Sequence, residues 1–156
     1  MKLSSAEWRI LDTVQTDGRI SNVELAKKAG LSESPCLRRL RQLEEAGIIK
    51  SYAALLDAKK LGYDVTAFVQ LTLDQRSVET REKFTAAIAR EALIVECYAV
   101  SGGYDYLLKV VATDLDAFSD FVMNRLLQYP GVKDMTSGFV LKEVKASTAL
   151  PLAEHA

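Results

Sequence analysis

Residues 32–45, SESPCLRRLRQLEE, combine polar side chains with three arginines. If this stretch is a helix, its leucines form a buried stripe, so Ser34, Arg38 and Gln42 point outward. Such a surface suits the DNA major groove, where short polar and guanidinium groups read base edges and flanking arginines hold phosphates. A solvated charged face is the alternative reading. The predicted buried stripe consists of Leu37, Leu40 and Leu43. The candidate DNA contacts are Ser32, Ser34, Arg38, Arg39, Arg41 and Gln42.

A second stretch whose residues could bind a ligand is VSGGYDYLLK, residues 100–109. Gly102 and Gly103 can expose backbone N–H groups that hold a carboxylate, while Asp105 or exposed carbonyls can hold an ammonium group. A small molecule carrying both groups, such as a free amino acid, fits that chemistry. The alternative is an ordinary glycine hairpin in which Asp105 bonds its own turn. Taken alone, the residues favour the hairpin.

The elements that must position the first site are three short helices in residues 1–50. Ser21 and Glu24 stand three apart and form a capping box for the second helix, which Gly30 ends. A corner of about three residues then leads to a third helix capped at Ser32. This order of caps, glycine stops and a short corner predicts a helix-turn-helix domain over residues 1–50.

The second site requires a different domain. The run IIKSYAALL changes to a β-rich pattern and predicts a β-strand hinge or linker over residues 51–62. Beyond it, residues 63–156 alternate strands and helices in the order βαββαβ, which predicts a ferredoxin-like α+β domain with both helices on one face. Pairing with a second copy is a reasonable way to cover the other face. The predicted strands are 65–73, 93–100, 106–112 and 132–144, and the predicted helices are 77–90 and 115–129.

Composition excludes several classes of protein. The chain has 156 residues and a net charge of −1, but residues 1–50 carry nine Lys/Arg against seven Asp/Glu, so the basic excess lies at the N-terminal end. Cys36 and Cys97 lack disulfide or zinc spacing, and His155 is the only histidine, so no metal site or catalytic triad is predicted. No run is long enough to span a membrane, and the first residues lack a signal-peptide core. We expect a cytoplasmic protein without a membrane partner.

Five stretches together resemble the leucine-responsive/asparagine-regulator (Lrp/AsnC, feast/famine) family of prokaryotic transcription regulators. They are DGRISNVELAKKAGLSESPCLRRLRQLEEAGII, YAALLD, SGGYDYLLKV, LLQYPGV and FVLKEVK. The resemblance runs from about Leu3 to Leu152 in the family's order. It implies a regulator that binds double-stranded DNA and whose activity or assembly responds to a small amino acid, with no other cofactor. It also implies a homodimer that assembles further to an octamer.

The same resemblance implies the effector site. It places the amino acid at the glycine turn and at a segment of β-strand from a neighbouring subunit. The implied residues are Ser101, Gly102, Gly103, Tyr104, Asp105, Thr136, Ser137, Gly138 and Phe139. Two other function classes remain as alternatives: an architectural DNA-binding protein without an effector, and a small ferredoxin-like enzyme, for which no acid/base or nucleophile set is found.

Overall fold

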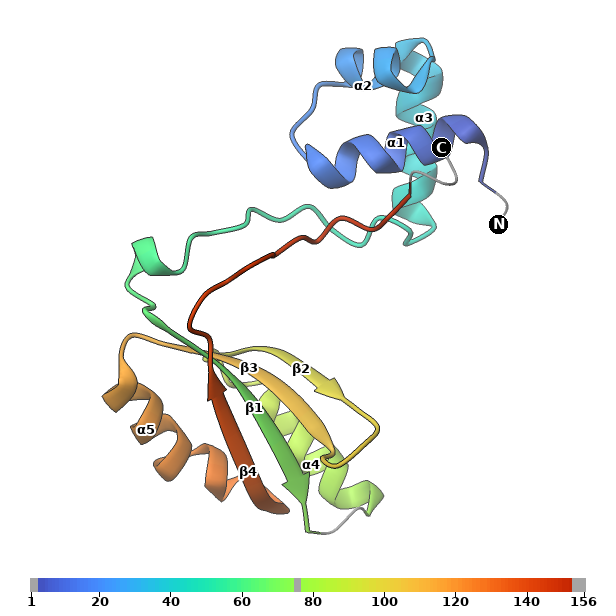
Figure 1. Cartoon of the computed structure of the whole chain (residues 1–156). Helices are drawn as coiled ribbons and strands as arrows, with labels where there is room; N and C mark the ends of the chain where they lie inside the picture. The colour runs from blue at the N-terminus through green and yellow to red at the C-terminus, as the bar shows by residue number, and fades with distance from the viewer. Residues whose placement is uncertain (1–2, 75–76, 153–156) are drawn as a thin grey trace. The chain divides into compact units, whose positions relative to one another are not determined.

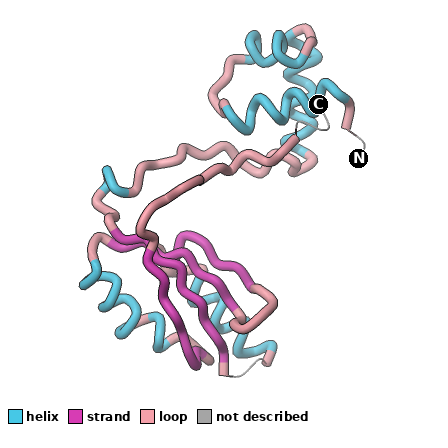
Figure 2. The backbone as a smooth tube through the Cα atoms, viewed as in Figure 1, coloured by secondary structure: helices cyan, strands magenta, loops and turns pink. Residues whose placement is uncertain are grey.

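The computed structural model describes residues 3–74 and 77–152, and the chain divides into two compact units. The first contains Met1–Leu55 together with Lys145–Ala156, and the second contains Leu56–Val144. Among the described residues, helices are the only regular elements of the first unit, whereas the second unit combines strands with helices (Figure 1, Figure 2). His155 lies outside the described residues.

The first unit holds three helices with well-defined ends: α1 (Ser5–Thr16), α2 (Asn22–Ala29) and α3 (Glu33–Glu45). Ser4 caps α1 in a reciprocal capping box with Glu7. Ser21 caps α2 by accepting from the Glu24 N–H at 3.2 Å, and Gly30 ends it in the left-handed conformation with φ of 68°. The helix order and the stop at Gly30 confirm the predicted helix-turn-helix, although among the described residues no bond from Glu24 back to Ser21 completes the predicted capping box.

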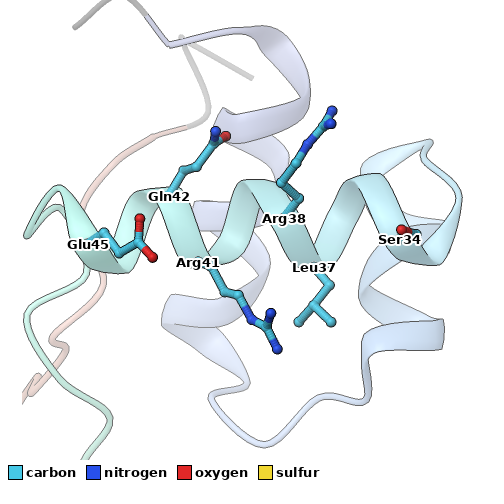
Figure 3. Close-up of a pocket in the computed structure, with 6 residues that line it drawn as sticks. All are labelled: Ser34, Leu37, Arg38, Arg41, Gln42 and Glu45. Carbon is cyan, nitrogen blue, oxygen red and sulfur yellow. The ribbon is translucent and has the colours of Figure 1, made fainter.

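The buried stripe of α3 differs from the prediction. Cys36 and Leu43 are fully buried and Leu40 packs against them, whereas Leu37 is only half-buried and does not join the core (Figure 3). Steps of about 100° per residue put Cys36, Leu40 and Leu43 within a sector of about 60°, and Leu37 lies about 60° beyond its Leu40 edge. The core of the unit is Ile10, Leu11, Val14, Leu25, Ala26, Ala29, Cys36 and Leu43.

The C-terminal segment belongs to the first unit, although the sequence analysis grouped it with residues 63–156. The Gln15 amide donates to the Leu150 carbonyl at 3.0 Å and accepts from the Leu150 N–H at 2.8 Å. Leu152 packs against the helical core. A segment of irregular backbone gives no periodic pattern, so only these contacts reveal where it folds.

The predicted hinge strand is absent from the described residues. Residues 51–57 have no regular secondary structure, and a 3₁₀ helix (η1, Lys59–Leu61) follows. A β-rich sequence becomes a strand only when another strand supplies hydrogen bonds, and no described strand of this chain pairs with it. The start of the linker is held instead by Tyr52, whose hydroxyl donates to Glu44 at 2.8 Å.

The second unit is the predicted ferredoxin-like fold. Its elements are β1 (Val65–Leu73), α4 (Val78–Ile88), β2 (Ile94–Ala99), β3 (Tyr106–Ala112), α5 (Leu115–Asn124), a 3₁₀ helix η2 (Leu126–Gln128) and β4 (Val132–Phe139). The strands form one antiparallel sheet in the order β2-β3-β1-β4. Both helices lie on one face of this sheet (Figure 1).

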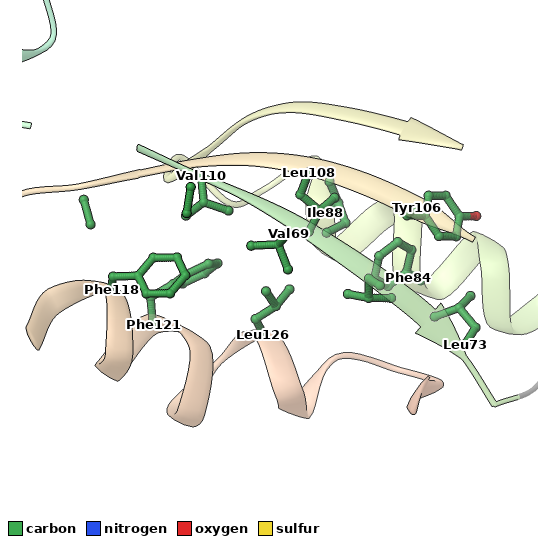
Figure 4. Close-up of a cluster of buried hydrophobic side chains, with 13 residues drawn as sticks. Val69, Leu73, Phe84, Ile88, Tyr106, Leu108, Val110, Phe118, Phe121 and Leu126 are labelled. Carbon is green, nitrogen blue, oxygen red and sulfur yellow. The ribbon is translucent and has the colours of Figure 1, made fainter. Parts of the chain in front are cut away.

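The core of this unit lies between the sheet and α4 and α5 (Figure 4). Strand β1 shows why: Ala67, Val69 and Leu71 are buried, while Phe68 and Gln70 between them are exposed. The helix predicted over 115–129 is shorter in the structure, since α5 stops at Asn124, where Arg125 leaves helical geometry. The last strand ends at Phe139, before the predicted 144.

Candidate functional site

The exposed face of α3 forms the first candidate site. Six of its side chains line a shallow hollow of about 370 Å³, namely Ser34, Leu37, Arg38, Arg41, Gln42 and Glu45 (Figure 3). Four of these are predicted DNA contacts, so the structure brings Ser34, Arg38, Arg41 and Gln42 together. In the described part of the chain, the guanidinium groups of Arg38 and Arg41 have no hydrogen bond or ion pair. Both are available to an anionic partner.

Arg39 lies on a different side of α3. Its guanidinium pairs with the Glu7 carboxylate at 3.3 Å and donates to the Ser4 hydroxyl at 3.3 Å, which ties α3 to the N-terminus of α1. Hydrogen bonds from Ser4, with a smaller contribution from Arg39, lower the pKa of Glu7. Arg39 is therefore engaged within the unit, unlike its two neighbours on the helix.

Ser32 is exposed at the N-cap of α3, but its side chain makes no capping hydrogen bond. The helix start is held in part by Asn22, whose amide donates to the Glu33 carbonyl at 3.1 Å. The hydroxyl of Ser32 and the first backbone N–H groups of α3 thus lie on the surface next to Ser34. Such groups can donate to phosphate oxygens.

The second candidate site is a hollow of about 220 Å³ in the second unit. It lies on the face of the sheet opposite α4 and α5, because its β1 and β4 residues alternate with the buried ones. The pairing of β1 with β4 sets Gln70 beside Thr136 and Thr72 beside Asp134, and the turn before β3 closes one end. The lining residues are Gln70, Thr72, Gly103, Tyr104, Asp134, Met135 and Thr136.

The chemistry of this hollow is mixed. Among the described residues, the N–H groups of Gly102, Gly103 and Tyr104 donate no hydrogen bond to the protein. The Asp134 carboxylate uses Oδ1 to accept from the Met135 N–H at 2.8 Å, and no described group bonds Oδ2. The turn and strand surface therefore offer donors for a carboxylate, and Asp134 offers an acceptor for a cation.

Only three of the nine predicted effector residues line the hollow: Gly103, Tyr104 and Thr136. Asp105 does not, because its Oδ2 accepts from the Leu73 N–H at 2.9 Å and fixes the end of β1. Ser101 and Gly102 flank the hollow, and the φ of 130° at Gly102 requires glycine there.

The β4 residues divide between the two faces of the sheet. Ser137 and Phe139 pair with buried Val69 and Ala67 and share their face, where Phe139 meets Phe118 at 5.0 Å between ring centroids. Gly138 lies on the open face but outside the lining. The sequence did not predict the other four lining residues, Gln70, Thr72, Asp134 and Met135. The alternation of β1 and β4 was a signal that could have found the first three.

Other kinds of site are not found in the described residues. No group of three or more His, Cys, Asp or Glu side chains there could hold a metal ion. Within residues 3–74 and 77–152, no helix is long and apolar enough to cross a membrane. Cys36 is buried in the helical core and Cys97 packs against the sheet core, and burial raises the pKa of both thiols.

Comparison with known proteins identifies both units. Residues 3–50 match the family described as winged helix-turn-helix DNA-binding, and residues 66–150 match the Lrp/AsnC ligand binding domain. The chain belongs to the Lrp/AsnC family of transcriptional regulators. It is therefore a ligand-modulated transcriptional regulator with a DNA-binding unit and a ligand-binding unit. The exposed face of α3 lies in the first matched region, and the hollow in the second.

Individual Lrp/AsnC proteins are similar over nearly the whole chain. The leucine-responsive regulatory protein of Salmonella typhimurium is 43% identical over 148 residues, which cover 95% of this chain and 90% of the relative. A transcriptional regulator from Neisseria meningitidis, solved as a complex with L-Met, is 43% identical with a TM-score of 0.94, covering 98% of this chain and 99% of the other. An AsnC family regulator from Agrobacterium tumefaciens is 35% identical with a TM-score of 0.91, and the match covers 99% of this chain and 100% of the other.

Proposed function

We propose that this regulator reads a specific DNA sequence with the exposed face of α3 and adjusts its DNA binding or its assembly when a small apolar amino acid occupies the hollow on the open sheet face. The observation that carries the proposal is the presence of two exposed polar surfaces in separate units, one cationic and on a helix, the other offering both hydrogen-bond donors and a carboxylate. The regulator from Neisseria meningitidis crystallised with L-Met supports the amino acid.

On the DNA side, position along α3 divides the roles. The N-terminal part of a recognition helix reaches base edges, so Ser34 and Arg38 read bases, with Gln42 one turn further on. Ser32 donates to a phosphate at the helix start, and Arg41 holds a phosphate through its longer reach. We assign Arg39 a different role from the one expected, because its pairing with Glu7 orients α3 on α1.

On the ligand side, the proposal divides the two charged ends of an amino acid. The N–H groups of Gly103 and Tyr104, with the hydroxyl of Thr136, donate to the carboxylate. Asp134 accepts from the ammonium group, in place of Asp105. A volume of about 220 Å³ is below the 300–1,000 Å³ of typical drug-sized sites and suits a small molecule.

The assembly proposed here is a homodimer that associates further to an octamer. The open face of the sheet exposes Phe68 and Tyr98 beside a cluster of Lys109 and Glu96, and no described element of the second unit covers it. The linker exposes Leu55 and Leu56 in an extended segment without a pairing strand. A second copy of the chain that pairs with the linker would supply the missing strand partner, and by covering the sheet it would bury the exposed side chains. Residues from a neighbouring copy would then complete the ligand site.

We propose no catalytic activity and no cofactor besides the amino acid. We also propose a cytoplasmic location, where a regulator meets double-stranded DNA. The relatives named above are transcriptional regulators, which supports the first point. An architectural DNA-binding protein without an effector is the other function that the experiment below separates from this proposal.

The experiment combines DNA selection with a ligand screen. Random duplexes enriched on the purified protein should converge on a near-palindromic site, and a thermal-shift screen of the twenty amino acids should raise Tm with a few apolar ones only. Light scattering at micromolar concentration should give a dimer or larger. Selection without a consensus, together with no amino acid that raises Tm, would support the architectural function instead.

A further inference from the structure

Leu37 is the one leucine of α3 that the helical core does not use. It is half-buried, yet it does not pack against the core cluster, whereas Leu40 does. On a helix with about 100° per residue, Leu37 lies about 60° beyond the Leu40 edge of the core sector that Cys36, Leu40 and Leu43 form. Its side chain is thus placed at the border of the exposed face.

The neighbours of Leu37 on the surface are polar. Ser34 lies three residues before it and Arg41 four residues after it, so the three side chains are successive on one side of the helix. In Figure 3, Leu37 and Arg41 extend to one side of the helix axis, while Arg38 and Gln42 extend to the other. Among the residues that the structure describes, Leu37 is the only apolar one that lines the hollow.

We propose that Leu37 is a specificity-determining residue that contacts the C5-methyl group of a thymine in the major groove. This inference rests on the proposed DNA-reading role of α3. Thymine carries the one methyl group among the base edges of that groove, and apolar side chains recognise it. Leu37 lies in the first half of α3, level with Ser34 and Arg38 rather than with the C-terminal end, so it enters the groove with the base-reading residues.

The flanking charges favour DNA over a protein as the occupant. Leu37 lies beside Arg41 and one residue before Arg38, and neither arginine is paired with a carboxylate among the described residues. An apolar side chain at the border of a face with two unpaired guanidinium groups suits a ligand that offers both phosphates and a methyl group. That combination is the major groove at a thymine.

Substitution of deoxyuridine for thymine tests the contact, because it removes only the methyl group and keeps base pairing. Each thymine of the selected duplex is replaced in turn, and affinity is measured with the full-length protein. The wild type should lose about fourfold in affinity at one thymine of each half-site, the effect of one buried methyl group. Leu37→Ala and the longer, polar Leu37→Gln should bind the thymine and deoxyuridine duplexes equally.

Gln42→Ala is the matched control, since Gln42 is exposed on the other side of the helix axis. It should weaken binding but keep the fourfold preference for thymine. Circular dichroism and Tm establish that both Leu37 variants are folded. A wild type insensitive to every replacement, or folded Leu37 variants that keep the preference, would overturn the inference. Failure of the wild type to select any site would instead overturn the proposed role of α3, and this inference with it.

Discussion

The two candidate sites of this regulator are built in opposite ways. The α3 surface comes from one helix, and its six lining residues fall within residues 34–45. The hollow in the second unit draws on three separate segments, residues 70–72, 103–104 and 134–136, which only the antiparallel sheet brings together. A local site can be read from periodicity, whereas an assembled site depends on strand register. The sequence was accordingly more accurate at the first.

The largest expected effect is at Arg38, on the local site. Arg38→Ala should cost about 1–3 kcal/mol in binding to the selected duplex and relax base preference at one position of each half-site. Tm should not change, because no described residue forms a hydrogen bond or ion pair with the exposed guanidinium. Arg41→Ala is the matched variant, and we expect it to weaken selected and random DNA alike and to reduce the salt slope by about 1. Fluorescence anisotropy over a salt series measures both. Wild-type affinity in Arg38→Ala would contradict the assignment of the α3 face.

The next largest effect is expected in ligand binding at the assembled site, where Asp134 and Asp105 have different roles. Asp134→Asn should weaken L-Met binding by about 1–3 kcal/mol, because it removes the charge proposed to hold the ammonium group. Asp105→Asn should leave L-Met affinity nearly unchanged and lower Tm slightly, because an uncharged amide oxygen accepts more weakly from the Leu73 N–H than the carboxylate does. Calorimetric titration with parallel melting curves tests the pair. If the two variants exchange these phenotypes, the role of the two carboxylates has been assigned the wrong way round.

A smaller effect distinguishes Arg39 from Arg38 within one helix turn. Arg39→Ala should destabilise the first unit by about 1 kcal/mol, since it removes a partly buried ion pair with Glu7. DNA binding by the folded variant should fall less than in Arg38→Ala.

The same pair predicts a pH dependence. The folded-state pKa of Glu7 is lowered from 4.5, so its contribution to stability is present above pH 4.5 and is lost as pH falls through the lowered pKa. Glu7→Gln should remove that part of the acid sensitivity. Urea unfolding between pH 3 and 7 measures it, and an unaltered acid profile in Glu7→Gln would contradict the role of this pair.

The smallest effect tests the segment that follows the second unit in the chain. Gln15→Ala removes two exposed hydrogen bonds to the Leu150 backbone and should cost about 0.5–1 kcal/mol. Gln15→Glu keeps an acceptor for the Leu150 N–H and should cost less. A chain ending at Val144 also loses the packing of Leu152 and should melt below Gln15→Ala. Equal Tm for all three and the wild type would show that residues 145–152 do not stabilise the first unit.

The sequence predicted both folds, because their signals are local. Ser21, Gly30 and the three-residue corner determine the helix-turn-helix, and the alternation of β1 with the apolar stripes of α4 and α5 determines the βαββαβ order. It failed where contacts are long-range. The linker needs a strand partner, and the placement of the C-terminal segment depends on hydrogen bonds to Gln15. Leu37 was assigned to the core because three leucines at three-residue steps resemble a buried stripe.

The candidate sites show the same division. Ser34, Arg38, Arg41 and Gln42 share the exposed face as predicted from the helix. In the hollow, Asp105 was chosen for its place beside the glycines, but its carboxylate is used by a backbone N–H of the neighbouring strand. Asp134 lies 29 residues further along and enters through its register opposite Thr72. Nothing in a single sequence specifies that register before the sheet is known.

The most direct test of this account is thermodynamic linkage between the two sites. Affinity for the selected duplex is measured with and without saturating L-Met, and affinity for L-Met is measured with and without the duplex. If the hollow regulates the α3 surface, both comparisons must change by the same factor, about 5- to 150-fold for typical coupling. Asp134→Asn should shift the concentration at which L-Met acts and leave DNA affinity without L-Met unchanged. L-Met that binds the protein but leaves DNA affinity the same would contradict the account.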